Sequence, residues 1–217
     1  MRPPQLLHVE DDAPLRRSVL LTLADEGFGV REAANGEQAL RQLDCAPDAV
    51  LLDLGLPDID GFELCRQIRH RSGSPIFILS VQKGPDDVAH ALAAGADDYL
   101  PKPFSTADLA RRFRALLTPG PADASTDNPG EDLHGDHGGL SGPPLGLTVT
   151  ESRLLSALAA QRGRGLDRDA LLRQVWGTPP IAGSAVLVAR IHSLRSKLEA
   201  AGGPSIGTTG TGYLLQA

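Results

Sequence analysis

The first part of the chain alternates short apolar runs with amphipathic segments, and this alternation constrains the fold more than any other feature. The apolar runs have the length of buried strands and span Leu6–Val9, Gly29–Ala33, Ala49–Asp53, Pro75–Ser80 and Asp98–Leu100. Segments with helical spacing follow them at residues 14–25, 36–44, 61–70, 86–94 and 105–117. This pattern is typical of a parallel sheet with helices on both faces. The sequence therefore predicts a doubly wound, five-stranded α/β domain over residues 1–118.

Polar residues gather where these predicted strands end. They are Glu10, Asp11 and Asp12 after the first strand, Asp53 at the end of the third, Ser80 at the end of the fourth and Lys102 after the fifth. The carboxyl ends of parallel strands meet at one edge of such a sheet, where ligands bind. Carboxylate oxygens suit Mg²⁺, and the ion would offset the repulsion among neighbouring carboxylates. An aspartate beside it can attack a phosphoryl group, while a lysine and a hydroxyl stabilise the added charge.

Four motifs at these positions resemble the receiver domain of bacterial two-component response regulators, which has a CheY-like, flavodoxin-like α/β fold. In chain order they are LLHVEDDAPLR, VLLDLGLPDIDG, FILS and GADDYLPKPF. The resemblance implies that a sensor histidine kinase phosphorylates Asp53. It also implies a Mg²⁺ ion held by Glu10, Asp11, Asp53 and the backbone carbonyl of Gly55.

The same resemblance gives roles to the other side chains of this edge. Lys102 would pair with the phosphate, Ser80 would hydrogen-bond it, and Tyr99 matches an aromatic residue that swings inward when the hydroxyl moves. Asp12 resembles an extra carboxylate rather than a metal ligand. Val81 departs from the family, which usually has a small alanine there, and its branched side chain would narrow access to the acceptor.

Simpler interpretations of the single residues remain open. Asp11 or Asp12 could be only the N-cap of the next helix, with Pro14 in the first turn. Lys102 lies between two prolines and could be a surface residue, and Tyr99 could belong only to the core. We favour the phosphorylation site because the simpler interpretations require that all four motifs occur together by chance.

The motif GADDYLPKPF followed by STADLARRFRALL resembles the OmpR/PhoB subfamily. Receivers of this subfamily dimerise through the fourth helix, the fifth strand and the fifth helix. The resemblance places Asp97, Asp98, Asp108 and Arg112 at positions that pair across that interface. We therefore expect a homodimer formed through the receiver, with a solvated acidic turn and a basic helix face as the alternative.

A second domain follows a segment that cannot fold alone. Residues 119–144 are rich in Gly, Pro and Asp and poor in apolar residues, which predicts a flexible linker. Residues 140–217 contain 8 Lys and Arg against 4 Asp and Glu, a balance of +4 in a chain whose net charge is −6. This basic region is the candidate for a polyanionic partner.

Residues 145–217 predict three helices and a terminal hairpin, the pattern of a winged helix-turn-helix. Thr150 would cap the first helix, residues 167–177 and 184–203 would form the next two, and residues 208–215 would form the hairpin. The motifs LTVTE, VWG, RIHSLRSKL and GTGYLL resemble the OmpR/PhoB effector domain. The resemblance implies promoter DNA binding, with the third helix in the major groove.

The residues available for that DNA contact are few. They are Arg190, Arg195 and Lys197, which could reach phosphates, together with His192 on the outer face of the third helix. The predicted wing, Gly207–Tyr213, contains no arginine, although the family usually has one there. Because phosphate contacts supply most non-specific affinity, we expect weak or dimer-dependent DNA binding. The alternative is an effector domain that docks on a protein such as RNA polymerase.

Composition limits the remaining function classes. The chain has two cysteines and no apolar run close to the roughly 20 residues of a membrane span, so we expect a reduced cytoplasmic protein with no membrane partner. We do not expect an enzyme. An aspartyl-phosphate phosphatase using Asp53 would need an acid/base carboxylate two residues later, where Gly55 stands.

Overall fold

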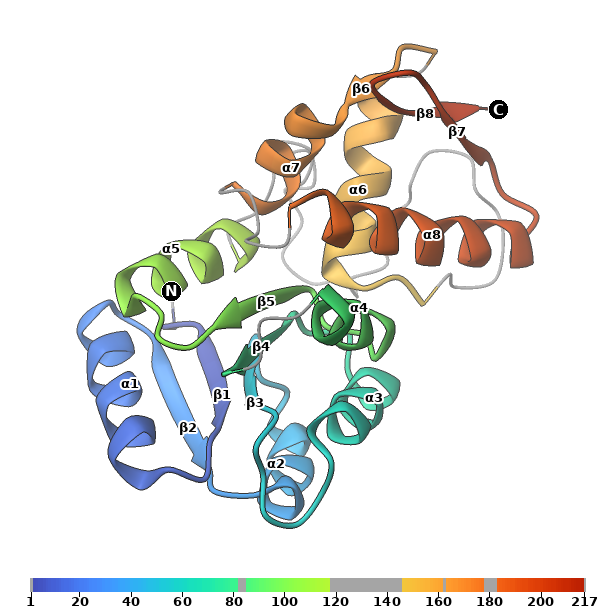
Figure 1. Cartoon of the computed structure of the whole chain (residues 1–217). Coiled ribbons are helices and arrows are strands. Elements are labelled where there is room, and N and C mark those ends of the chain that lie inside the picture. Colours follow the sequence, from blue (N-terminus) through green and yellow to red (C-terminus); the bar gives the residue numbers. More distant parts are fainter. Residues whose placement is uncertain (1, 82–84, 118–145, 162, 178–182, 217) are drawn as a thin grey trace.

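The computed structural model describes residues 2–81, 85–117, 146–161, 163–177 and 183–216. Within these residues the chain forms two domains, each built around one sheet (Figure 1). The linker predicted at residues 119–144 lies outside the described residues, and the predicted domain boundaries stay a prediction.

The N-terminal domain, residues 2–81 and 85–117, which we call the receiver domain after the resemblance described above, contains five parallel strands in the order β2-β1-β3-β4-β5. The strands are β1 (Gln5–Val9), β2 (Gly29–Ala33), β3 (Ala49–Asp53), β4 (Ile76–Ser80) and β5 (Asp98–Pro101). The helices between and after them are α1 (Ala13–Asp25), α2 (Gly36–Gln42), α3 (Gly61–Arg71), α4 (Pro85–Ala93) and α5 (Thr106–Leu117), with a short 3₁₀ turn η1 (Leu43–Cys45) after α2. The predicted doubly wound α/β fold is confirmed.

The two faces of this sheet explain why its strands are apolar throughout. Alternate residues of a strand point to opposite faces, and helices cover both faces here. Leu51 and Phe77 pack in the core under α1 and α5, whereas Leu52 and Ile78 pack in the core under α2, α3 and α4. Because the strands are parallel, the carboxyl ends of β1, β3, β4 and β5 lie at one edge of the domain.

The C-terminal domain, residues 146–161, 163–177 and 183–216, which we call the effector domain after the same resemblance, contains three helices and a small antiparallel sheet in the order β6-β8-β7. Its elements are α6 (Val149–Ala160), β6 (Leu166–Asp167), α7 (Arg168–Trp176), α8 (Ser184–Ala200), β7 (Ser205–Thr208) and β8 (Gly212–Gln216). This architecture confirms the predicted winged helix-turn-helix.

Three details of this domain differ from the prediction. Thr148, not Thr150, caps α6, because the Thr148 hydroxyl accepts the Glu151 N–H while the Glu151 carboxylate accepts the Thr148 N–H. Thr150 is buried inside the first turn. The hairpin begins earlier than predicted, at Ser205, and β6 adds a third strand that had no recognisable apolar alternation.

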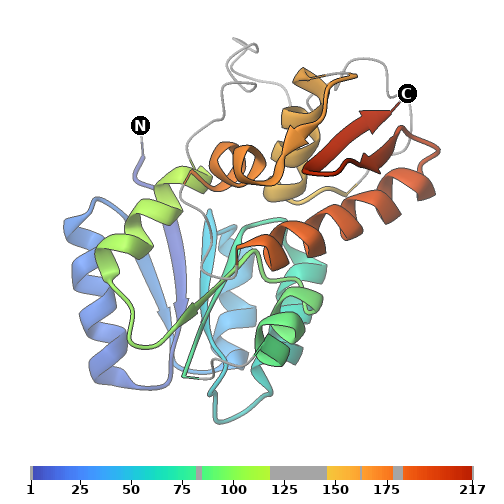
Figure 2. The same ribbon diagram turned by 45° about the horizontal axis from the view of Figure 1, so that its top comes forward.

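The two domains contact each other along one side of the receiver. Helix α8 packs against α4, and α7 packs against α5, as Figures 1 and 2 both show. The apolar core under α1 and α5 continues into the effector core around Trp176. Among the described helices, none is both long and apolar enough to cross a membrane.

Candidate functional site

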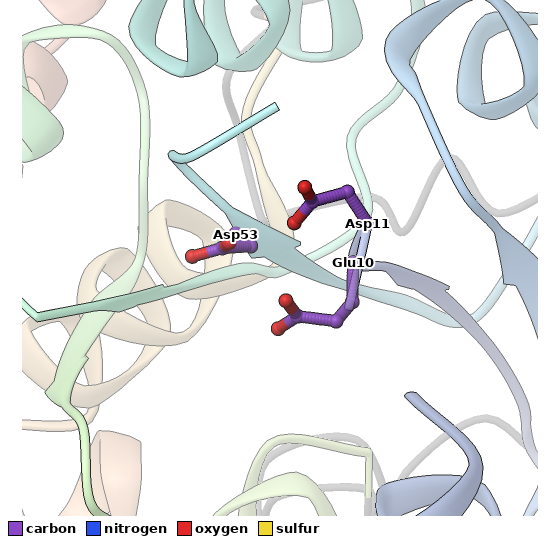
Figure 3. Close-up of side chains that lie close together, drawn as sticks. All are labelled: Glu10, Asp11 and Asp53. Carbon is purple, nitrogen blue, oxygen red and sulfur yellow. The ribbon is translucent and has the colours of Figure 1, made fainter. Parts of the chain in front are cut away.

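An acidic cluster lies at the carboxyl edge of the receiver sheet. β1 and β3 are neighbouring parallel strands in which Val9 pairs with Leu52, so Glu10 and Asp11 lie beside Asp53 (Figure 3). One carboxylate oxygen of each of the three residues lies within 4.8 Å of the other two. Glu10 and Asp53 are buried, whereas Asp11 is exposed. The cluster therefore opens to solvent on the side of Asp11.

Asp12 is separate from this cluster. Its carboxylate accepts the N–H of Leu15 at 2.8 Å and so caps α1, with Pro14 in the first turn. The capping alternative thus holds for Asp12, and Asp11 is left facing the other carboxylates.

Lys102 provides the positive charge of the site. Its Nζ lies 2.7 Å from Glu10 Oε2 and 3.1 Å from Asp53 Oδ1. Burial alone would lower the pKa of Lys102, but these two carboxylates outweigh it and raise the pKa above its usual value. Burial raises the pKa of Glu10, an effect that the hydrogen bond from Lys102 opposes. Lys102 is therefore a charged member of the site and not a surface lysine.

Ser80 and Tyr99 lie side by side below this edge. Ser80 ends β4, Tyr99 lies on β5, and both are buried. Burial raises the pKa of Tyr99, while a hydrogen bond with the Ser80 side chain partly opposes that effect. Val81, the residue after Ser80, follows the end of β4 and is 75% exposed.

Gly55 leaves room beside Asp53. A Cβ atom at this position would lie 3.3 Å from Asp53 Oδ2, closer than most real Cβ contacts. A larger residue would therefore crowd the carboxylate that the resemblance identifies as the phosphate acceptor.

Arg16 is a site residue that sequence reasoning missed. Its guanidinium donates to the backbone carbonyl oxygens of Glu10 at 2.6 Å and Asp11 at 3.2 Å, and it lies 3.5 Å from Glu32 Oε1. It ties the loop that carries both carboxylates to α1. The available signal was its position one helical turn after the N-cap Asp12.

The four residues predicted for the dimer interface have partners within the chain. Asp98 pairs with Arg112 at 2.8 Å, and Arg112 also pairs with Asp108 at 2.8 Å. Asp97 is buried and pairs with Arg69 at 2.5 Å. Their role between receivers stays a prediction.

The residues predicted for DNA contact are not brought together on one exposed surface. Arg190 is buried and donates to the carbonyl oxygen of Ala96 in the receiver. Arg195 and Lys197 are half-buried, and only His192 is exposed.

Arg195 and Lys197 have partners inside the effector domain. Arg195 donates to Ile206 O and Thr208 Oγ1, both at 2.8 Å. Lys197 donates to the buried Glu151 carboxylate at 2.6 Å. Direct DNA contact by these residues stays a prediction.

Comparison with known protein families agrees with both halves of this description. Residues 6–114 match the response regulator receiver domain, and residues 142–215 match the C-terminal domain of transcriptional regulatory proteins.

Curated relatives cover nearly the whole chain. The transcriptional regulatory protein AfsQ1 of Streptomyces coelicolor is 38% identical over 201 residues, which cover 90% of this chain and 89% of that protein. The response regulator MprA of Mycolicibacterium vanbaalenii is 38% identical over 230 residues, covering 99% and 98%. The transcriptional regulatory protein PrrA of Mycobacterium bovis is 37% identical and covers 98% and 96%.

Solved structures match the receiver part. A putative response regulator from Chloroflexus aurantiacus superposes with a TM-score of 0.51 at 38% identity, covering 54% of this chain and 99% of that one. The BeF3-activated N-terminal receiver domain of Klebsiella pneumoniae RstA gives a TM-score of 0.51 at 31% identity, covering 53% and 99%. The chain therefore belongs to the two-component response regulators of the OmpR/PhoB family, with an N-terminal receiver domain and a C-terminal winged-helix transcriptional regulatory domain.

Proposed function

We propose that this response regulator is switched by phosphorylation of Asp53 by a sensor histidine kinase. The observation that carries the proposal is the convergence of Glu10, Asp11 and Asp53 with the ammonium group of Lys102. Such a site can receive a phosphoryl group and compensate its charge.

Mg²⁺ fits this set of ligands. Glu10, Asp11, Asp53 and the Gly55 carbonyl would hold it, because Mg²⁺ prefers oxygen ligands and usually binds through a few carboxylates and waters. When bound, it would neutralise charge on the carboxylates and on the phosphoryl oxygens. Arg16 keeps the loop carrying Glu10 and Asp11 in position.

The chain's own residues divide the remaining work. An Asp53 carboxylate oxygen attacks the phosphorus of a phosphohistidine on the kinase. The new O–P bond forms as the N–P bond breaks, and the imidazole nitrogen keeps the electron pair. Lys102 then pairs with the phosphoryl oxygens, and Ser80 donates a hydrogen bond to them, which takes its hydroxyl away from Tyr99.

The first test is phosphorylation of the full chain with acetyl phosphate and Mg²⁺, followed by intact-mass measurement. Asp53→Asn should abolish incorporation, and chelation of Mg²⁺ should do the same. Asp44→Asn is a matched control, because Asp44 is exposed and lies in η1, which precedes the amino end of β3 and so lies away from the carboxyl ends of the strands. Undiminished incorporation in Asp53→Asn would contradict the proposed acceptor.

For the output, we propose promoter DNA binding as a homodimer formed through the receiver, in the cytoplasm. The basic balance of residues 140–217 and the winged-helix architecture support it. The test is a salt titration of DNA binding by the full chain treated with beryllofluoride. A log–log slope near −0.9 per phosphate contact, with roughly three or more contacts, supports DNA binding.

A second output has its own supporting observation. The exposed residues of α8 include Ala185, Val188, His192 and Ser196, none of which is a lysine or arginine, and Glu199 follows them near the end of the helix. Such a surface suits a protein partner such as RNA polymerase better than a phosphate backbone. The absence of saturable DNA binding at low salt, with the chain phosphorylated and dimeric, would favour this alternative.

A further inference from the structure

The loop between β3 and α3 carries one of the proposed metal ligands. It spans residues 54–60, directly after Asp53, and Gly55 is its second residue. The other proposed ligands are side chains, whereas Gly55 would bind the ion through its backbone carbonyl. A backbone carbonyl has no rotamer of its own to adjust, so the contacts that fix the loop decide where this oxygen lies.

The beginning of the loop is fixed by Gly61, the first residue of α3. Gly61 is buried, and a Cβ atom there would lie 2.4 Å from Leu54 Cα and 2.8 Å from Leu54 O. Real Cβ atoms do not come so close to a backbone, so only glycine allows α3 to begin at this place. Helix α3 is itself held by Leu64 and Ile68, which are fully buried. The contact therefore sets the position of Leu54, the residue that precedes Gly55.

The end of the loop is fixed by Asp58. Its carboxylate accepts the N–H of Gly36 at 2.9 Å and the N–H of Glu37 at 3.0 Å, at the beginning of α2. The first N–H groups of a helix have no partner within the helix, so Asp58 supplies acceptors that α2 lacks. The hydrogen bond from Gly36 contributes most to lowering the pKa of Asp58, so this carboxylate is ionised at neutral pH.

Ile59 makes an apolar contact at the same place. A Cβ atom at Gly36 would lie 2.3 Å from Ile59 Cγ2, and the Ile59 side chain packs against the core under α2 and α3. These two helices lie side by side on one face of the sheet (Figure 1). The loop is thus attached to α3 through Leu54 and to α2 through Asp58 and Ile59, and none of these contacts requires a metal ion.

We propose that Gly61 and Asp58 are positioning residues that hold the Gly55 carbonyl in place for Mg²⁺. The inference rests on the proposed function, because it assumes that this carbonyl is a metal ligand. Both residues act through the loop backbone and not by contact with the ion. A ligand that is already in place needs no ordering when the ion binds. Without the attachments, only the molecules whose loop is in place bind at the original affinity, so the apparent dissociation constant rises as that fraction falls.

The first experiment compares two glycines in the unphosphorylated full chain. Calorimetric titration with Mg²⁺ gives the dissociation constants of the wild type, Gly61→Ala and Gly73→Ala. Gly61→Ala should raise the dissociation constant roughly tenfold to a hundredfold, the usual effect of losing a group that orients a metal ligand. Gly73→Ala is the matched control and should bind like the wild type. Gly73 follows the other end of α3, and a Cβ atom there would meet nothing within 4 Å.

The second experiment compares two aspartates of the loop. Asp58→Asn replaces one accepting oxygen by an NH₂ group, which cannot accept the second N–H. Asp60→Asn removes the same charge from the same loop, but Asp60 caps α3, and Asn is an equally good cap. Asp58→Asn should therefore weaken Mg²⁺ binding severalfold more than Asp60→Asn does. Hydrogen exchange without metal gives an independent reading, because the amides of residues 36 and 37 should exchange faster in Asp58→Asn alone.

The dependence of phosphorylation on Mg²⁺ distinguishes positioning from a general loss of structure. With acetyl phosphate, Gly61→Ala should need roughly tenfold more Mg²⁺ or above for half of its maximal rate. The rate at saturating Mg²⁺ should stay within a few-fold of the wild type. A saturating rate that falls by the same factor would make the role of Gly61 purely structural and overturn the proposal.

Unchanged Mg²⁺ affinity in a folded Gly61→Ala would overturn the proposal, as would equal affinities in Asp58→Asn and Asp60→Asn. Far-UV circular dichroism checks that each variant is folded. Asp58 is exposed, so the pair of aspartate variants decides the question even where Gly61→Ala does not fold. These outcomes leave the proposed function intact. A wild type that binds no Mg²⁺ would overturn the proposed function, and this inference with it.

Discussion

The carboxyl edge of the receiver sheet and the surface of α8 both carry residues that motif resemblance marks as functional, but their surroundings differ. At the edge, Glu10, Asp11 and Asp53 converge and share Lys102. On α8, Arg190 and Lys197 have partners inside the chain instead of facing solvent. A parallel sheet brings its strand ends together by backbone geometry alone, whereas the partner of a helix side chain depends on what packs against that helix.

The largest effect expected at the edge is on metal binding. Asp11→Asn removes one unit of negative charge from a proposed Mg²⁺ ligand. At about 4 Å and an effective dielectric constant near 20, one charge pair is worth about 4 kcal/mol, so affinity should fall by at least about a hundredfold. Calorimetric titration with Mg²⁺ measures this change.

The neighbouring residue supplies the control for that experiment. Asp12→Asn makes the same substitution at a residue that caps α1, and Asn is an equally good N-cap. Its Mg²⁺ affinity should stay within a few-fold of the wild type. Equal losses in both variants would mean that the whole acidic loop, and not the converging cluster, attracts the ion.

On the effector side, Lys197→Met tests whether the lysine is structural or contacts DNA. Its partner Glu151 is buried, and burial, which raises the pKa of Glu151, is outweighed by Lys197 and Ser193, so that pKa lies below its usual value. Loss of the half-buried lysine should therefore destabilise the chain by about 1–2 kcal/mol in chemical denaturation.

The salt dependence of DNA binding separates the two roles of Lys197. Replacing a structural lysine should leave the log–log slope of affinity against salt unchanged. Replacing a lysine that contacts a phosphate should lower the magnitude of that slope by about 0.9. Arg164→Met, at an exposed arginine of the same domain, is the control for stability. A changed slope with unchanged stability would place Lys197 on the DNA and weaken the contrast between the two regions.

The receiver also contains a buried polar residue without a partner, His8 on β1. Neither ring nitrogen has a hydrogen-bond partner among the described residues. Burial, with the charges of Lys102 and Arg16, lowers the pKa of His8 to about 3. The unfolded chain takes up a proton near the ordinary histidine pKa and the folded chain does not, so stability falls as the pH drops below about 6.5.

His8→Val should remove this acid sensitivity. Between pH 7 and pH 5 the wild type should lose about 2 kcal/mol of unfolding free energy more than the variant. His70→Gln, at an exposed histidine of α3, should behave like the wild type. Parallel pH profiles for the wild type and His8→Val would show that the imidazole is protonated, or hydrogen-bonded, in the folded chain.

The smallest effect is expected at Val81. Val81→Ala removes two methyl groups from an exposed side chain beside Ser80 and so widens the access to Asp53. Phosphorylation by acetyl phosphate and loss of the phosphoryl group should therefore both become severalfold faster. Time courses of intact mass measure both rates. Unchanged rates would mean that Val81 leaves the approach to Asp53 open.

Much of the fold could be predicted from the sequence because local patterns carry it. The five apolar runs became β1 to β5 with ends shifted by a residue at most, since a buried parallel strand requires an uninterrupted apolar run. The cap of α6 was misplaced because Thr148 and Thr150 both precede the helical stripe, and only the reciprocal bonds with Glu151 distinguish them. The strand β6 has two residues, too few for any periodicity.

The site and the interdomain contact mark the limit of that reasoning. The alternation of strands and helices and the residues at the strand ends are properties of the chain itself, so the sequence by itself determined the α/β fold and the residues that meet at its edge. Only the tertiary structure decided that Arg190 faces Asp97 and that Arg16 supports the acidic loop. The reason is physical: a long, flexible cation pairs with whichever buried acceptor lies within reach, and that acceptor is defined by packing between segments far apart in the chain.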